Sequence, residues 1–232
     1  LAAGTIALTP WALAYATFSL LPAPDDAKDL RLAYEYGLPR PAWTMWLYSL
    51  AYPFVIASPF VLRTHAELRR FVVGAWTATI SGYALMILMP GKADLLSSNY
   101  SGFTAMLAHA NRSLDADWLA LPSFHVIWSV FAAYCFSRRW PLLKGLWWLL
   151  AAGIAVSCIT TGSHAVIDVP AGILLGIVCW QIDRIWSWLI RVCERLSNSW
   201  GAIEIGPVRV ISHAIWSALA ASVGTALALF LA

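Results

Sequence analysis

Long apolar segments determine what this chain can fold into, because a helix that crosses a bilayer needs about 20 largely apolar residues. Seven segments are candidates for such helices, and residues 118–121 extend the fourth one upstream. They cover residues 5–21, 42–62, 71–89, 123–136, 142–159, 164–185 and 208–231. Only 12% of the 232 residues are charged, whereas soluble domains average about 25%. The sequence therefore predicts an all-α, polytopic transmembrane helical bundle.

The distribution of basic residues predicts the orientation of this bundle. Connectors 63–70, 137–144 and 184–209 lie on one predicted side and hold ten Lys and Arg residues, against five in the opposite connectors. Cytoplasmic loops of membrane proteins carry the excess of Lys and Arg. We therefore expect the first side to be cytoplasmic and residues 123 and 164 to lie at the outer side. This orientation suits a multi-pass protein of a bacterial inner membrane whose site faces the periplasm.

Several other sequence features bear on disulfides, zinc binding, signal peptides and partners. The four cysteines form no CxxC pair, so we expect neither a disulfide framework nor a zinc site. The sequence begins with Leu1, so we expect further residues upstream. The first apolar segment lacks both a basic region and a clear cleavage site, so it is not read as a signal peptide. The expected partner is the bilayer and not nucleic acid, while the oligomeric state stays open.

The longest outer connector, about residues 91–121, contains apolar residues at helical spacing. These are Phe103, Met106, Leu107, Ala110 and Leu114. Such spacing predicts a short amphipathic helix on the membrane surface. This helix could serve as a lid over a site or as a plain spacer.

His164 and Asp168 are the first candidate site residues. They are four residues apart at the start of a predicted helix, where positions i and i+4 share a face. Asp168 can therefore reach the imidazole of His164, fix its tautomer and stabilise its cation. Ionisable residues inside membrane segments are costly, which favours a functional site. The alternative is a polar contact that ties two helices together.

A second cluster, Pro-Ser-Phe-His at residues 122–125, opens another predicted helix on the same outer side. Proline suits a helix start, Ser123 suits an N-cap, and free N–H groups there can bind an anion. His125 would then lie within reach of the same anion as His164. Two imidazoles around one phosphate allow one to attack phosphorus and the other to protonate the leaving oxygen. The alternative is two unrelated N-caps with interfacial histidines.

At these residues the sequence resembles the type 2 phosphatidic acid phosphatase (PAP2) superfamily, over about residues 40–190. Residues 122–125 are similar to the Pro-Ser-x-His motif of that family. Ser157, His164 and Asp168 have the spacing of its Ser-Arg–five–His–three–Asp motif. The resemblance implies a six-helix core, to which the last apolar segment adds one further transmembrane helix.

The same resemblance implies a role for each matching residue. His164 would be the nucleophile that forms a phosphohistidine, and Asp168 would orient it and stabilise its charge. His125 would be the general acid for the leaving group, and Ser123 would bind phosphate oxygens. The resemblance implies no metal ion and no other cofactor.

The sequence departs from the family pattern at its basic residues. Cys158 replaces the arginine of the third motif, and a neutral thiol cannot hold a phosphate as a guanidinium can. In the first motif Lys92 is present, but Asn99 stands where Arg-Pro is expected. Lys92 and Arg112 are the nearest substitutes as phosphate ligands, whereas Arg40 is interpreted as an ordinary interfacial charge. A His–three–Asp motif without the arginine also resembles the motif of the sphingomyelin synthase and inositol phosphorylceramide synthase branch.

The leading hypothesis is a membrane lipid phosphatase that cleaves a lipid phosphate or diphosphate at the outer leaflet through a phosphohistidine. A lipid phosphotransferase, which moves a phospho-headgroup between lipids, uses the same residues. A transporter or a non-catalytic lipid-binding scaffold is the alternative from another class.

The chain is predicted to have two parts. Residues 1–196 form the PAP2-like transmembrane domain, and residues 197–232 form a linker and the additional transmembrane helix. Residues 205–209 faintly resemble the opening of prolipoprotein diacylglyceryl transferase, so the second part could begin a truncated domain.

Overall fold

The computed structural model describes residues 2–93, 100–113, 118–197, 202–205 and 207–231. In this part of the chain the α-helices are α1 (Ala2–Ser19), α2 (Thr44–Ala57), α3 (His65–Leu88), α4 (Gly102–Arg112), α5 (Phe124–Arg139), α6 (Lys144–Thr160), α7 (Asp168–Trp180), α8 (Ile182–Ser197) and α9 (Ser212–Leu231). Short 3-10 helices are η1 (Ala33–Gly37), η2 (Ser58–Val61) and η3 (Pro141–Leu143). Strands β1 (Lys28–Asp29) and β2 (Gly91–Lys92) pair in parallel, whereas β3 (Ala202–Ile205) and β4 (Val208–Ile211) pair antiparallel. The predicted all-α membrane bundle is confirmed.

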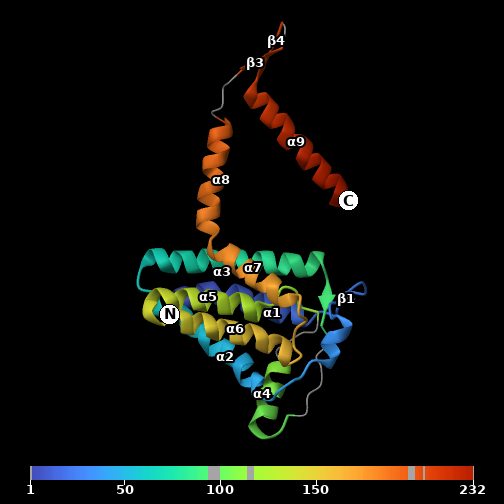
Figure 1. The fold of residues 1–232 in the computed structure, drawn as a ribbon, viewed down its shortest axis with the longest axis vertical. Helices are drawn as coiled ribbons and strands as arrows, with labels where there is room; N and C mark the ends of the chain where they lie inside the picture. Colours follow the sequence, from blue (N-terminus) through green and yellow to red (C-terminus); the bar gives the residue numbers. More distant parts are fainter. Residues whose placement is uncertain (1, 94–99, 114–117, 198–201, 206, 232) are drawn as a thin grey trace. The chain divides into compact units, whose positions relative to one another are not determined.

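The chain divides into two compact units, residues 1–182 and 183–232. The first unit holds α1 to α7 and both candidate motifs (Figure 1). The second holds all but the first residue of α8, the β3–β4 hairpin and α9. The predicted domain boundary between residues 196 and 197 stays a prediction.

Helix α5 is the centre of the first unit. It packs against α2, α6 and α7, while α3 packs against α1 and α7. Most of its side chains are buried, including the fully buried Ile127 and Phe131. A helix that is apolar and buried on all sides belongs to the interior of a bundle. The residues at its first turn are therefore held on every side, which gives His125 a rigid support.

Two glycines allow α7 to approach α5 closely, as their four-residue spacing predicts. A Cβ atom on Gly172 would lie 2.8 Å from the carbonyl oxygen of Ser123, and one on Gly176 would lie 3.1 Å from Cβ of Val130. Only glycine fits at Gly172 without a shift of backbone. This contact brings the first turns of the two motif-bearing helices together.

The sequence predicts seven membrane-spanning segments, but fewer helices of the structure are long enough for a complete span. In the described residues, three stretches are long and apolar enough to cross a membrane: Thr44–Val61, His65–Leu88 and Pro141–Thr160. Helices α7 and α8 add a fourth if the pair is taken as one broken span. Helix α5, with 16 residues, is shorter than a full span because it begins only at Phe124.

Three predicted helix boundaries are wrong for local reasons. Residues 118–121 do not extend α5, because Leu119 forms a β-bridge with Gly91. Most of the predicted connector 63–70 is the start of α3, where Thr64 and Glu67 form a capping box. Residues 208–211 form strand β4 because they are rich in β-branched side chains and pair with β3.

The predicted amphipathic helix of the outer connector is present as α4, although Leu114 lies outside the described residues. Phe103 and Met106 are exposed, and Ala108 and Asn111 face inward. Helix α4 packs on α2, where the Asn111 amide donates to Ser49 Oγ at 2.9 Å. It is therefore attached to the bundle at the start of α2.

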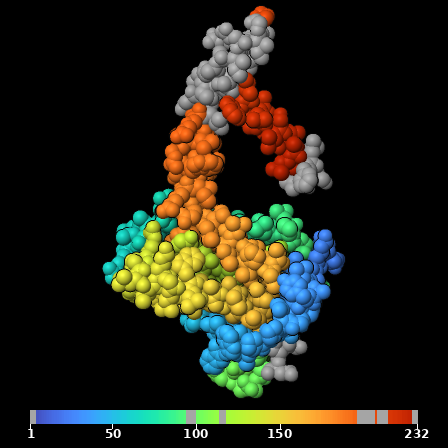
Figure 2. Space-filling model, in the orientation of Figure 1, coloured from blue at the N-terminus to red at the C-terminus, as the bar shows by residue number. Residues whose placement is uncertain are grey.

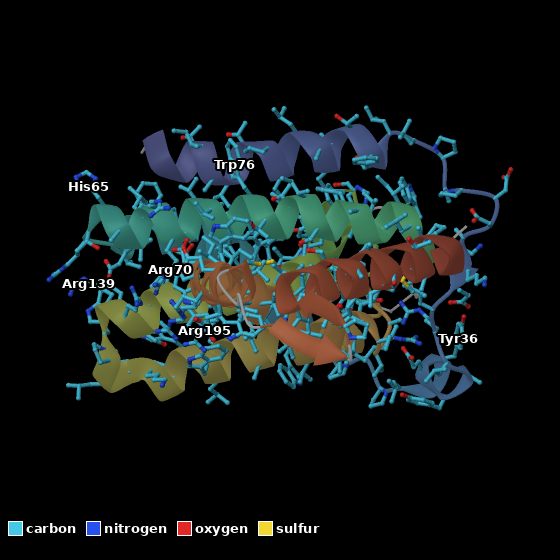
Figure 3. The ribbon with its side chains drawn as sticks, turned by 90° about the horizontal axis from the view of Figure 1, so that it is seen from above. Tyr36, His65, Arg70, Trp76, Arg139 and Arg195 are labelled. Carbon is cyan, nitrogen blue, oxygen red and sulfur yellow. The ribbon has the colours of Figure 1, made fainter. Side chains whose placement is uncertain are left out.

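Several basic residues lie at the end of the first unit that is opposite to the candidate site. Figure 3 shows His65, Arg70 and Arg139 toward one end of the bundle and Tyr36 toward the other. Tyr36 belongs to η1, which lies beside the segment that carries His164. The separation agrees with the charge pattern, while the assignment of the basic end to the cytoplasm stays a prediction.

Candidate functional site

His164 and Asp168 are in contact, but they do not lie on one helix as the sequence predicts. Helix α7 begins at Asp168, so His164 lies in the turn before it. An earlier start would place Pro170 in the helix interior, where its ring clashes with a carbonyl one turn back. Gly162 has a φ of +75°, a left-handed conformation that favours glycine, and it allows the sharp turn between α6 and α7.

The Asp168 carboxylate holds this turn and the imidazole together. Its Oδ2 atom accepts a hydrogen bond from Ala165 N at 2.9 Å and lies 3.3 Å from His164 Nδ1. An ionised carboxylate only accepts hydrogen bonds, so beside one a neutral His164 would carry its proton on Nδ1 and keep a lone pair on Nε2. Asp168 Oδ1 is buried and has no hydrogen-bond partner among the described residues. The arrangement thus leaves His164 Nε2 as a nucleophile or base.

Ser123 meets His164 on its other side. Its Oγ atom lies 3.2 Å from His164 Nε2 and 3.9 Å from Cys158 Sγ. Ser123 occupies the N-cap position of α5, as predicted, but its side chain makes no capping bond. Its backbone N–H instead donates to the carbonyl oxygen of Asp168 at 3.2 Å. The hydroxyl therefore contacts His164 and Cys158 and not the helix end.

His125 lies opposite His164, as the two motifs predict. The centroids of the two rings are 5.7 Å apart, with the rings edge to face. Tyr48 stacks on His125 with its hydroxyl 3.3 Å from Nδ1, and the Tyr52 hydroxyl lies 3.3 Å from Nε2. Neither tyrosine was predicted from the sequence, although their spacing of four residues on α2 places them on one helix face.

A cavity of about 410 Å³ adjoins the two histidines. His125, Ser163 and His164 line it, and its walls come mainly from apolar and aromatic side chains of α1, α2 and α5. Ser123 is fully buried and does not belong to the described lining. The line Ser123–His164–Asp168 has the order of a serine hydrolase triad, but only the histidine of that line reaches the cavity. His164 is therefore the better candidate to meet a substrate.

The described residues contain no group of three or more His, Cys, Asp or Glu side chains placed to hold a metal ion. The groups beside the cavity that could take part in catalysis include the two histidines, the carboxylate that holds one of them, and the hydroxyls of Tyr52 and Ser163.

A protein-family model matches the part of the chain that carries this geometry. The model of the PAP2 superfamily matches residues 41–182, which is more than half of the chain. The chain belongs to the PAP2 superfamily. Searches of curated proteins and of solved structures found no match. Membership supports an enzyme with a phosphatase-like function on lipid phosphates, and the matched range contains both histidine motifs.

Two buried ionisable residues outside the PAP2 match hold the His164 turn. Arg31 Nη1 donates to the carbonyl oxygen of His164 at 3.1 Å, and Nη2 donates to that of Gly162 at 2.7 Å. Glu35 Oε2 accepts from Val166 N at 2.8 Å. Arg31 is 8% exposed and Glu35 is 2% exposed. In Figure 2 the blue surface of this segment adjoins the golden surface of the chain near the start of α7.

Burial and nearby charges shift the pKa values of two residues in the 28–37 segment. Burial lowers the pKa of the Arg31 guanidinium, and the Glu35 and Asp168 carboxylates oppose that shift. Hydrogen bonds from the Tyr36 hydroxyl and from the Arg31 backbone lower the pKa of the Asp29 carboxyl. Arg31 and Glu35 were not predicted from the sequence, because no local motif links them to a turn more than 120 residues away.

The predicted phosphate ligands Lys92 and Arg112 are not part of the described cavity lining. Lys92 lies in β2 beside Asp29, and Arg112 ends α4, next to the cavity-lining Ser113. Their roles stay predictions, as does the dismissal of Arg40. Asn99, at the position of the lost Arg-Pro, lies outside the described residues. Cys158 is fully buried, and its carbonyl oxygen accepts from His164 N at 3.0 Å.

Arg31→Gln should lower kcat by about 100-fold, because a small displacement of a reacting group can cost that much. KM should change little, since Arg31 bonds to the backbone of the turn and not to the cavity. Arg31→Lys should not restore the rate, because an ammonium lacks the planar fork that reaches two carbonyls. The measurement is steady-state kinetics on the purified protein, together with its thermal stability.

Arg40→Gln is the matched control, because Arg40 closely follows the 28–37 segment and its bond to the Tyr36 carbonyl is exposed. Equal kcat for Arg31→Gln and the wild type would show that the guanidinium does not position His164.

Proposed function

We propose that this protein is a membrane lipid phosphatase that hydrolyses a lipid phosphate or diphosphate at the outer leaflet through a phosphohistidine. The observation that supports it most is the pairing of His164 with His125 beside the cavity. Asp168 leaves the cavity-facing imidazole with a lone pair at Nε2. The PAP2 match over both motifs supports the same chemistry.

In the proposed first step, His164 Nε2 attacks phosphorus and the phosphorus–oxygen bond to the lipid breaks. His125 gives a proton to the leaving oxygen, so a lipid alcohol departs from a lipid phosphate and a lipid monophosphate departs from a diphosphate. Asp168 stabilises the positive charge that develops on the His164 ring. The Ser123 hydroxyl, released from Nε2, can then donate to a phosphate oxygen.

In the proposed second step, His125 removes a proton from water, and the hydroxide oxygen attacks phosphorus. The bond between phosphorus and Nε2 breaks, and inorganic phosphate leaves. His164 regains its lone pair, and the proton on His125 serves the next cycle. The residues are thus returned to their starting state without a cofactor entering the steps.

The cavity supports a substrate with a hydrocarbon chain. Its lining joins His125 and His164 to apolar residues on one face of α1 and one face of α2. A volume of about 410 Å³ lies within the range of small-molecule sites, about 300–1,000 Å³. With its phosphate at the histidines, a lipid would therefore have its hydrocarbon chain among apolar side chains.

Transfer is the alternative reaction at the same site. If a lipid alcohol attacked the phosphohistidine in place of water, the product would be a new lipid phosphate. The absence of the third-motif arginine at Cys158 keeps this alternative and the sphingomyelin synthase-like branch in consideration. A binding scaffold without turnover is the alternative from another class.

The direct test follows the fate of the phosphoryl group from a ³²P-labelled diacyl lipid phosphate. The purified protein is incubated with and without a lipid alcohol acceptor. Release of labelled inorganic phosphate in both samples supports hydrolysis. A labelled acceptor lipid would show transfer and contradict the proposed hydrolysis. Saturable binding of the lipid phosphate without either product would support the non-catalytic scaffold.

Ala12→Leu should lower kcat/KM for a long-chain lipid phosphate by about 10-fold, because added methylenes in an apolar pocket discriminate by roughly 10–200-fold. Ala12 lines the cavity from α1, so a larger side chain takes space from the hydrocarbon chain. The rate on a short, water-soluble phosphate ester should stay unchanged. Both rates are measured by phosphate release.

Thr9→Leu is the matched control, because Thr9 is an exposed residue of α1 outside the described lining. An equal loss on the long-chain and the soluble substrate would contradict a hydrocarbon site between α1 and α2.

A further inference from the structure

Helix α8 separates its side chains into two faces. Positions three or four residues apart share a helix face. The apolar face contains Ile182, Ile185, Trp186, Leu189 and Cys193. The opposite face contains Arg184, Ser187, Arg191 and Arg195. Asp183 and Glu194 also lie on the polar side, so the arginines outnumber the carboxylates there by three to two.

The apolar face of α8 is exposed in the second unit. Ile185, Trp186 and Leu189 on this face are between 39% and 60% exposed, and Trp188 and Ile190, which border the polar face, are 58% and 40% exposed. An exposed apolar patch of this kind marks an interaction surface. Two tryptophans on one short helix are also typical of the interface between water and a membrane.

We propose that α8 lies flat on the bilayer surface, with its apolar face among the acyl chains and its arginines bound to anionic lipid headgroups. A helix that is strongly amphipathic, with tryptophan on one face and arginine on the other, has the composition of an interfacial helix. Its position supports the proposal, because it follows the apolar helix α7 of a membrane protein after one residue, Gln181.

The charges of α8 argue against its crossing of the membrane. Arg184, Arg191 and Arg195 would each enter the hydrocarbon if α8 continued the path of α7, and charged residues there are costly. On the surface the same guanidinium groups remain in water and meet the phosphates of anionic lipids. Binding of α8 to the surface does not depend on the phosphatase mechanism.

Cys193 provides a reporter on the apolar face. Cys135, Cys158 and Cys179 are buried, whereas Cys193 is exposed. A nitroxide spin label attached to the whole protein should therefore modify Cys193. The matched control carries the label on the polar face, as Cys193→Ser combined with Ser187→Cys. Labelled Cys193→Ser alone gives the background from the buried thiols.

The protein is placed in nanodiscs of phosphatidylcholine with phosphatidylglycerol. The label at position 193 should be accessible to oxygen and protected from water-soluble nickel, at a depth of about 5–10 Å below the headgroups. The label at position 187 should be accessible to nickel. Equal nickel accessibility at both positions would overturn the proposal.

Two other results would also overturn the proposal. Protection of position 193 from both oxygen and nickel would indicate a protein contact, and a depth at the bilayer centre would indicate a transmembrane segment.

The role of the arginines is tested by changing the lipid. Removing phosphatidylglycerol or raising salt should increase the nickel accessibility of position 193 several-fold. Arg191→Gln with Arg195→Gln should remove this dependence, whereas Arg69→Gln, at an exposed arginine of α3, should leave it unchanged. If the nickel accessibility of position 193 in the wild type did not change with lipid charge, anionic headgroups would be excluded as ligands of the arginines.

Discussion

His164→Gln should lower kcat by about 10⁴-fold or more, the scale on which removal of a catalytic nucleophile acts. Glutamine keeps a polar side chain of similar length but has no ring nitrogen with a lone pair for attack on phosphorus. The bond between His164 Nδ1 and Asp168 would be lost together with the developing charge that it stabilises. The measurement is phosphate release, with rapid-quench trapping of the labelled protein.

The trapped protein identifies the nucleophile. A phosphohistidine loses its label in acid and keeps it in base, whereas a phosphoserine is stable in acid. An acid-stable label that persisted in His164→Gln would indicate a hydroxyl nucleophile, such as Ser123 or Ser163, and contradict the proposed mechanism. His109→Gln is the matched control because His109 is an exposed histidine of α4 outside the described cavity lining, and it should keep full activity.

His125→Gln should lower kcat by about 10²–10⁴-fold on a lipid phosphate, the usual contribution of a general acid. The loss should be much smaller for an aryl phosphate, because a phenolate leaves without needing a proton from the enzyme. His125 is placed for this role by the cavity and by the edge-to-face approach of its ring to His164. The measurement compares kcat for the two leaving groups in the wild type and the variant.

An equal loss on both substrates would indicate that His125 binds or positions the phosphate and does not protonate the leaving group. His65→Gln serves as the control, since His65 is exposed and lies toward the opposite end of the bundle (Figure 3). The Tyr48 and Tyr52 hydroxyls both approach the His125 ring, so a second comparison with Tyr52→Phe shows whether they tune the acid.

Local patterns in the sequence were sufficient for the helical class and for the two histidine motifs. A long apolar segment predicts a membrane helix from its own composition and length, whatever the rest of the chain does. The placement of both motifs at the same end of the bundle followed from counting helices between them. For this reason His125, Ser123, His164 and Asp168 were predicted together, and the structure brings these four side chains into one cluster.

The start of α7 shows where helical spacing alone was misleading. An i, i+4 pair predicted a shared helix face, yet His164 and Asp168 meet across a turn. Pro170 already contained the signal that the helix begins later. The predicted contact is nevertheless present, because the Asp168 side chain reaches back over the turn to Ala165 N and the imidazole.

Sequence alone determined that this chain is an α-helical membrane protein with two histidine motifs at one end, because hydropathy and motif spacing are local properties. Tertiary structure decided which groups surround those histidines. Arg31 and Glu35 reach the His164 turn from a segment more than 120 residues away, and Ser123 turns its hydroxyl to His164 because α7 packs on α5 at Gly172. Contacts between distant segments depend on how helices pack, and no spacing within one segment encodes that.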